Sequence, residues 1–192
     1  MHPIAISLLT VCGVDELPAQ SARRVTHVLS LLDPDWPDIA AFGAYGKHSR
    51  KTLWFHDIID DRPGMTMPQV EHVAEIVSFG SELASSRNER SDGHLLVHCQ
   101  MGISRSTAAM LTLLAQTHPQ ETEDRLFERL REIRPQAWPN SRMIGFADDL
   151  LGREGRLLKA LARHYGVQLK EQPKFTEWMT KIGRSRELEM AR

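Results

Sequence analysis

The stretch His98-Cys99-Gln100-Met101-Gly102-Ile103-Ser104-Arg105-Ser106 places five residues between a cysteine and an arginine. It follows the apolar residues 95–97 and precedes a helix-like run over residues 107–116. This order predicts a strand, a tight loop and a helix in succession. Five residues are enough to curl a backbone around a tetrahedral oxyanion, with N–H groups and the helix N-terminus directed inward. We therefore interpret residues 99–105, hereafter the cysteine loop, as a phosphate-binding loop.

The two ends of the cysteine loop carry the groups that reaction with a phosphate ester requires. A helix N-terminus and a nearby cation favour the thiolate form of a cysteine, so Cys99 is expected to be a nucleophile that forms a cysteinyl-phosphate. Arg105 can fold back and hold two phosphate oxygens with its planar guanidinium group. The remaining charge would be bound by backbone N–H groups at Gln100, Met101, Gly102, Ile103 and Ser104. These roles are those of a cysteine-dependent phosphatase; the alternative for Cys99 is an inert buried cysteine.

The rest of the chain alternates apolar strands with helical patterns. Strands are expected at residues 4–9, 25–32, 52–56 and 94–98. Helices are expected from residue 68, at 106–116 and 121–133, after a cap at Asn140 or Ser141, and near 157–161. This alternation predicts an α/β fold with a central, mostly parallel twisted sheet of four to five strands flanked by helices. Ligands bind at the carboxyl ends of such strands, where Cys99 and Asp57 both fall.

The length of 192 residues suits one domain with a tail. We predict a domain over residues 1–165 and a C-terminal tail over residues 166–192. Within the tail, four apolar residues have the spacing of a short amphipathic helix: Phe175, Trp178, Met179 and Ile182. We expect this helix to pack on its own domain, with a partner or dimer surface as the alternative. The sequence leaves the oligomeric state open.

Charge and composition exclude several classes of partner. The formal net charge is -1, so no global field attracts the protein to nucleic acid or to an anionic membrane. No apolar run approaches the length of a membrane span. Two cysteines are too few for a disulfide framework, and a working thiolate needs a reducing compartment, which indicates a cytoplasmic location. The nine histidines form no metal-ligand pattern, and neither a metal nor a cofactor is expected.

The signature His98-Cys99-x5-Arg105-Ser106 resembles that of the protein tyrosine phosphatase superfamily, in particular its dual-specificity and bacterial tyrosine-phosphatase-like members. Other segments resemble the family's second strand, its approach to the acid loop and its post-catalytic segment: residues 25–29, Phe55-His56-Asp57, and Arg134-Pro135 with Pro139-Asn140. The resemblance covers about residues 1–160 and implies the cysteine-phosphatase fold without a cofactor. It also implies that the Ser106 hydroxyl helps to release the thiolate when water hydrolyses the intermediate.

The resemblance further implies that an aspartate on a separate loop protonates the leaving group. Three candidates lie together: Asp57, Asp60 and Asp61. Asp57 is favoured because it ends the third expected strand, where the family's acid usually lies; Asp61 is the next candidate and Asp60 the third. His98 is expected to fix the cysteine loop by hydrogen bonding rather than to transfer a proton.

The interior of the cysteine loop contains no lysine or arginine, whereas loops resembling those of inositide phosphatases carry basic residues there. Protein phosphotyrosine is therefore the favoured substrate, with phosphoserine and phosphothreonine as further candidates. A phosphoinositide or another small phosphoester remains an alternative. Sulfur or arsenate transfer would have only the remote Cys12 as a second thiol. A non-catalytic phosphopeptide-binding module would usually lack the cysteine or the arginine.

Overall fold

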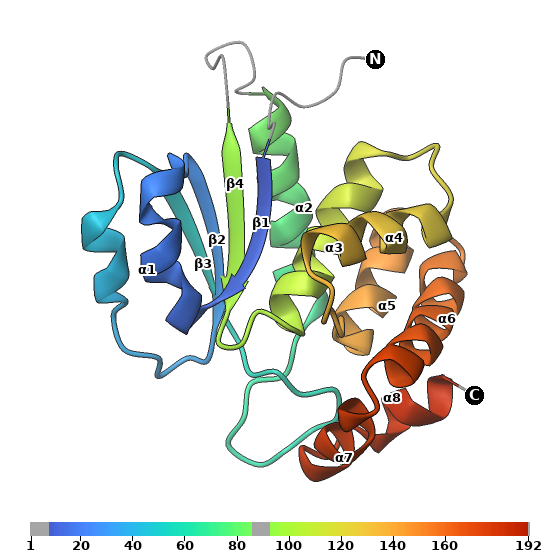
Figure 1. The fold of residues 1–192 in the computed structure, drawn as a ribbon. Coiled ribbons are helices and arrows are strands. Elements are labelled where there is room, and N and C mark those ends of the chain that lie inside the picture. The colour runs from blue at the N-terminus through green and yellow to red at the C-terminus, as the bar shows by residue number, and fades with distance from the viewer. Residues whose placement is uncertain (1–7, 86–92, 192) are drawn as a thin grey trace.

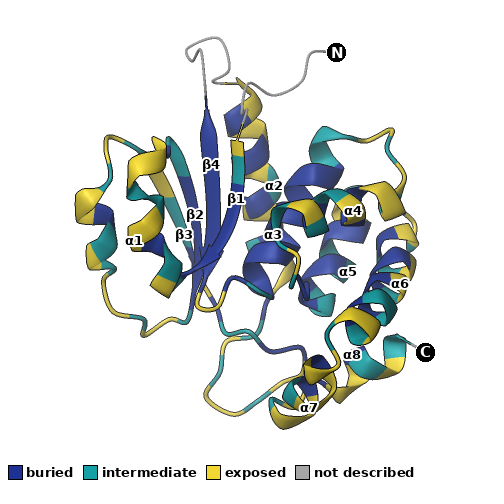
Figure 2. Ribbon diagram, viewed as in Figure 1, coloured by how far each residue is buried: buried dark blue, intermediate teal, exposed yellow. Residues whose placement is uncertain are grey.

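The computed structural model describes residues 8–85 and 93–191. Its four strands form one parallel sheet in the order β1-β4-β2-β3. Their bounds are Leu8–Gly13 for β1, His27–Leu32 for β2, Ser49–Trp54 for β3 and His94–Cys99 for β4. Strand β4 has a neighbour on both sides and is buried along its whole length (Figure 2). The predicted α/β class and parallel sheet are confirmed.

Helices cover both faces of the sheet (Figure 1). One face carries α1 (Leu17–Gln20) and short 3-10 turns at Val14–Glu16, Ser21–Arg23 and Ala40–Ala44. The helices beyond the other face are α2 (Val70–Ser85), α3 (Arg105–Thr117), α4 (Glu123–Ile133), α5 (Ser141–Leu150) and α6 (Arg156–Glu171). None of the helices within the described ranges is both long and apolar enough for a membrane crossing.

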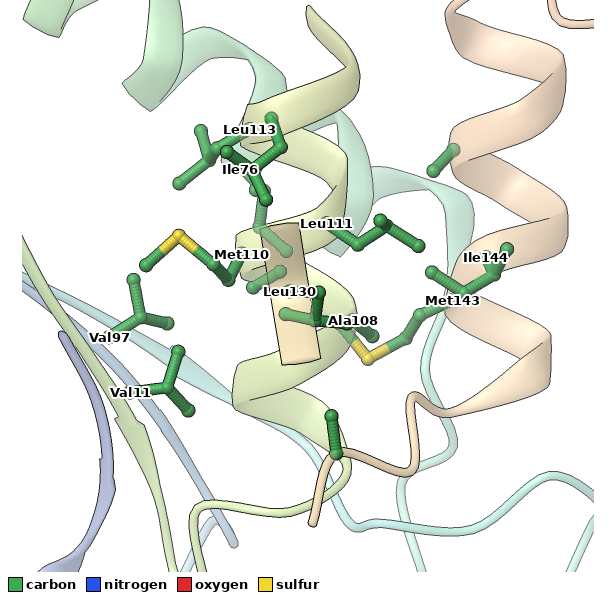
Figure 3. Packing of buried hydrophobic residues seen from close by; sticks show 14 of the residues in the cluster. Val11, Ile76, Val97, Ala108, Met110, Leu111, Leu113, Leu130, Met143 and Ile144 are labelled. Atoms are coloured by element: carbon green, nitrogen blue, oxygen red, sulfur yellow. The ribbon is translucent and has the colours of Figure 1, made fainter. Parts of the chain in front are cut away.

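Helix α3 lies at the centre of the main core. Figure 3 shows Val11 of β1 and Val97 of β4 beside Met110 of α3, with side chains of α2, α4 and α5 on the other sides of the helix. Every residue from 105 to 115 is buried, as the apolar pattern predicted. Because close-packed side chains allow little movement, α3 holds the cysteine loop on a rigid support.

The first and third strands differ most from their expected bounds, while β2 begins two residues later and β4 ends one residue later than expected. The first was expected at residues 4–9, but β1 begins at Leu8; residues 4–7 lie outside the described residues. Its pairing with β4 continues to Gly13 opposite Cys99, because this pairing buries Val11 and Cys12. Strand β3 ends at Trp54, where its partner β2 also ends, so Asp57 lies on the following loop rather than on the strand.

The predicted boundary between a domain and a tail is wrong. Residue 166 lies inside α6, which continues to Glu171. The following helices, α7 (Lys174–Lys181) and α8 (Ser185–Met190), pack on the same core, in which Phe175 and Met179 are buried. The amphipathic helix expected here therefore covers its own domain. Its apolar residues gain burial by packing against α6 and Trp138, which a separate tail could not provide.

Candidate active site

Cys99 is the last residue of β4, and the cysteine loop turns from there directly into α3. The thiol is almost fully buried, and its Sγ lies 3.1 Å from the Oγ of Ser106 in the first turn of α3. The loop thus lies at the carboxyl edge of the parallel sheet, where the sequence placed it. The continuity of strand, loop and helix brings Cys99 and Ser106 together.

Five successive carbonyl oxygens of the cysteine loop are turned outward, and each accepts a hydrogen bond from the surrounding protein. The donors to residues 100–104 are, in order, Val14 N, Arg134 Nη2, Arg134 Nε, Trp138 N and Ala108 N. In a trans peptide unit, the C=O and the following N–H point in opposite directions. The N–H groups of residues 101–105 therefore face the concave side of the loop, as an oxyanion site requires.

Gly102 allows the loop to pass against the end of β1. Its φ of +67° lies in the left-handed region, and an added Cβ would lie 2.3 Å from the carbonyl carbon of Cys12 and 2.5 Å from the nitrogen of Gly13. These neighbours are backbone atoms of a paired strand and cannot rotate away. Only glycine fits this position.

Arg134 clamps the outer wall of the cysteine loop. Its Nη1 and Nη2 atoms lie 2.8 and 2.7 Å from the two carboxylate oxygens of Glu16, and its Nε donates to the Gly102 carbonyl at 2.9 Å. Glu16 in turn accepts the N–H of Gly13 at 2.6 Å. The hydrogen bond from Arg134 lowers the pKa of Glu16, so the pair is ionic at neutral pH. The sequence resemblance included Arg134 in the post-catalytic segment but did not predict its contact with the cysteine loop.

Arg105 is buried beneath the cysteine loop and is anchored on one side. Its Nη1 donates to Asp33 Oδ1 at 2.7 Å and to the Phe55 carbonyl oxygen. Its Nε is one of three buried side-chain polar atoms without a hydrogen-bond partner within residues 8–85 and 93–191. An anchored guanidinium group with an unused N–H suits an oxyanion ligand. Asp33 follows β2 at the same sheet edge, but no local sequence pattern marks it as a site residue.

His98 precedes Cys99 on β4 and faces the opposite side of the sheet. Its Nε2 lies 2.6 Å from the Oγ of Ser30 on β2, and its ring is fully buried beside Phe42. Burial lowers the pKa of His98 to about 4, so the ring is neutral at neutral pH. A neutral ring on the far face of the strand can tie β4 to β2 but cannot reach a phosphate above Cys99.

Asp57 is the only one of the three candidate acids that contacts the cysteine loop in the described part of the chain. Its Oδ1 accepts hydrogen bonds from Ser104 Oγ at 2.7 Å and from Asn140 Nδ2 at 3.0 Å. Arg184 Nη1 lies 3.2 and 3.3 Å from its two oxygens. Burial by itself would raise the pKa of Asp57, but Arg184, Arg105 and these hydrogen bonds hold it below the usual value.

The other two candidate acids lie farther along the same loop. Asp60 forms an ion pair with Arg186, at 2.7 Å from its Nη2, and half of its side chain is exposed. Asp61 is exposed. Among the described residues, no group of three or more acidic, histidine or cysteine side chains could hold a metal ion.

Arg184 is a site residue that sequence reasoning missed. It lies just before α8, within the segment expected to be a tail, and its side chain is 1 % exposed. Besides Asp57, its Nη1 contacts Ser104 Oγ at 2.7 Å. No local pattern marks this residue, because its partners lie 80 and 127 residues earlier in the chain.

Cys12 does not join the candidate site. It packs with Val28 and Phe42 in the smaller core on one face of the sheet, whereas Cys99 belongs to the main core on the other face. Burial raises the pKa of the Cys12 thiol to about 12. Cys12 is therefore a protonated structural residue.

The chain is similar to known phosphatases in sequence and in fold. No protein-family model matches the chain. The chain is 30 % identical over 145 residues to MAP kinase phosphatase with leucine-rich repeats protein 3 of Dictyostelium discoideum, and 27 % identical over 161 residues to human protein phosphatase Slingshot homolog 3. These matches cover 76 % and 79 % of this chain but only 15 % and 21 % of the two relatives. Among solved structures, the Yvh1 phosphatase domain of Chaetomium thermophilum is 26 % identical with a TM-score of 0.51, covering 78 % of this chain and 93 % of that one.

Proposed function

Because the chain belongs to the protein tyrosine phosphatase superfamily, by its fold and its Cys-x5-Arg loop, we propose that it is a cysteine-dependent phosphatase acting on phosphate monoesters. The observation that carries this proposal is the cysteine loop itself. Surrounding donors hold its carbonyl oxygens, which directs its N–H groups to the concave side, and the Nε of Arg105 is buried without a hydrogen-bond partner among the described residues. This arrangement suits a phosphoryl group placed directly over a nucleophile.

The first step would transfer the phosphoryl group to the enzyme. The Cys99 thiolate attacks phosphorus, the S–P bond forms, and the bond from phosphorus to the leaving oxygen breaks. Arg105 and the inward N–H groups stabilise the charge on the equatorial oxygens. Asp57 is the candidate that donates a proton to the leaving oxygen, because it alone among the three candidates contacts the loop.

The second step would release phosphate. Water attacks phosphorus, the S–P bond breaks, and its electron pair returns to the sulfur of Cys99. Asp57, now a carboxylate, takes the proton of the water. Ser106 Oγ, 3.1 Å from the sulfur, can donate a hydrogen bond to the departing thiolate. No step in this sequence requires a metal or a cofactor.

A phosphorylated protein is the substrate class that we favour, with phosphotyrosine first. Both curated relatives are named as protein phosphatases, and the interior of the cysteine loop lacks the basic residues that extra phosphates would need. A catalytic cysteine has to stay reduced, so the proposed mechanism favours a reducing, cytoplasmic compartment. A phosphoinositide substrate and non-catalytic phosphopeptide binding are the outcomes against which this proposal is tested.

The test compares the wild-type protein with Cys99→Ser on phosphotyrosine and phosphothreonine peptides and on a phosphoinositide. We expect turnover by the wild type, highest on the phosphotyrosine peptide, and none by the variant. Tight peptide binding by both proteins without turnover would indicate a binding module. Higher turnover on the phosphoinositide would indicate a lipid substrate instead of a phosphorylated protein. Equal turnover by the wild type and Cys99→Ser would contradict the mechanism.

A further inference from the structure

We propose that Arg184 is a positioning residue that holds Asp57 against the cysteine loop and thereby favours phenolic over alkyl phosphate esters. This inference rests on the proposed phosphatase function and deepens it, because it assigns a substrate preference to a residue outside the expected domain. It concerns the segment from 174 to 190, which sequence reasoning had separated from the site.

The Arg184 guanidinium connects two elements of the site at once. Its Nη1 lies 2.7 Å from Ser104 Oγ in the cysteine loop and 3.2 Å from Asp57 Oδ1 on the loop after β3. Ser104 Oγ also donates to Asp57 at 2.7 Å. The three groups form a closed triangle of hydrogen bonds, so the position of Asp57 depends on both the cysteine loop and α8.

Arg184 is itself held in place by buried partners. Its Nε and Nη2 donate to the two oxygens of Glu187 at 2.8 and 2.7 Å. Glu187 is fully buried and also accepts hydrogen bonds from Trp138 Nε1 at 2.7 Å and from the N–H of Ser141 at 2.8 Å. With every Glu187 oxygen paired, the Arg184 side chain has little freedom to leave Asp57.

This arrangement fixes the chemical form of Asp57. Within residues 8–85 and 93–191, the side chains that hydrogen-bond it are Ser104, Asn140 and Arg184, and each acts as a donor to its oxygens. Such a set of partners stabilises the carboxylate and leaves little of the protonated form at neutral pH. The lowered pKa of Asp57 agrees with this geometry.

A mostly ionised proton donor affects leaving groups unequally. A phenolate ion has a conjugate acid with a pKa of about 10 and can depart with little proton transfer. The alkoxide of serine or threonine is a far stronger base and depends on a proton from the enzyme. Phosphotyrosine should therefore be hydrolysed much faster than phosphothreonine at neutral pH.

The experiment measures kcat/KM against pH on matched phosphotyrosine and phosphothreonine peptides. The test variant is Arg184→Met combined with Glu187→Gln, which removes both charges of the buried Arg184–Glu187 pair, still offers an oxygen to Trp138 or Ser141, and leaves Asp57 as the group that loses its ion-pair partner. Loss of Arg184 should raise the pKa of Asp57. The pH above which kcat/KM declines should therefore be higher by about one pH unit or more. At neutral pH, the ratio of phosphothreonine to phosphotyrosine turnover should rise by about tenfold or more.

Two further variants complete the design. Arg184→Lys keeps the charge and should restore most of the wild-type pH profile. Arg163→Met removes an exposed arginine that pairs with Asp124 through two hydrogen bonds, and it should leave profile and ratio unchanged. An equal loss of turnover on both peptides at every pH would overturn the role of Arg184 and leave the phosphatase function intact.

A direct titration separates the two proposals. Carbon-13 NMR of the Asp57 carboxyl group can be followed in Cys99→Ser with and without the Arg184 and Glu187 substitutions. We expect the pKa of Asp57 to rise when Arg184 is removed, whether or not turnover is measured. An unchanged pKa would overturn the inference by itself, whereas inactivity of the wild type would overturn the proposed function.

Discussion

At the scale of single residues, Cys12 is the next-to-last residue of β1 and Cys99 is the last residue of the neighbouring strand β4, yet their side chains lie in different cores on opposite faces of the sheet. A disulfide requires Cβ atoms directed toward each other at about 3.5–4.5 Å, so bridging them would require movement of the strands. Redox protection of Cys99 by Cys12 is therefore not built into this fold.

We predict that peroxide oxidises Cys99 without forming a disulfide to Cys12. Peroxide treatment in the presence of a label that reacts with sulfenic acid but not with methionine sulfoxide should add the label to the wild type and to Cys12→Ser, and not to Cys99→Ser. A species with the mass of an intramolecular disulfide, absent from Cys12→Ser, would contradict the arrangement of the two thiols.

Gly102→Ala should damage the cysteine loop. The new Cβ would collide with the backbone of Cys12 and Gly13 and would occupy a left-handed conformation. Displacement of the loop by about 1 Å can lower kcat/KM about 100-fold, and overpacking typically costs about 1–3 kcal/mol of stability. Turnover and urea unfolding measure the two effects. Gly43→Ala is the matched control, because its Cβ would meet no atom within 4 Å; similar losses in both variants would refute the explanation.

At the scale of elements, the cysteine loop is shaped from outside as much as by its own sequence. The turn after β1 supplies Val14 and Glu16, and the end of α4 supplies Arg134. These groups hold carbonyl oxygens on the convex side and so preorganise the N–H groups on the concave side. An oxyanion site prepared in this way needs little reorganisation on binding.

Glu16→Gln should weaken oxyanion binding by the cysteine loop. The amide cannot accept both guanidinium hydrogen bonds of Arg134, so the clamp on the Gly102 carbonyl loosens. We expect the inhibition constant of inorganic phosphate to rise about threefold to tenfold. Glu128→Gln, which disturbs an exposed pair with Arg125, is the control, and an unchanged inhibition constant for Glu16→Gln would show that the clamp does not act.

Sequence periodicity was sufficient for the strands, the main helices and the cysteine loop, because each of these depends on a local pattern. It was insufficient for Asp33 and Arg184, which act through partners far away in the chain. The segment containing Arg184 is polar and basic, which is typical of a solvated tail. Arg184 is buried because α7 and α8 pack over Trp138, and no local sequence pattern predicts that packing.

At the scale of the whole molecule, stability depends on two buried neutral histidines. His98 ties β4 to β2 through Ser30, and His164 of α6 lies 2.9 Å from the Ala137 carbonyl oxygen. Burial lowers the pKa of each to about 4, against 6.5 for an exposed ring. The unfolded chain therefore binds protons that the folded chain excludes as the pH falls from about 6.5 to about 4.

We predict that the free energy of unfolding decreases over that range and that each histidine accounts for about 2 kcal/mol of the loss by pH 5. Urea unfolding at several pH values measures the slope for the wild type, His98→Gln and His164→Gln. Each variant should be less stable at pH 7 but should lose less stability on acidification. Parallel curves for all three proteins would refute the assignment.

The ring of Trp138 packs against the rings of Tyr165 and Phe175, at centroid distances of 4.2 and 4.9 Å. Its indole N–H donates a hydrogen bond to the Glu187 carboxylate. Of the four tryptophans, it is the one that is fully shielded from solvent. Its fluorescence should therefore be blue-shifted and inaccessible to an aqueous quencher while α7 and α8 are in place. The protein carries an intrinsic optical reporter for the contact that supplies Arg184 to Asp57.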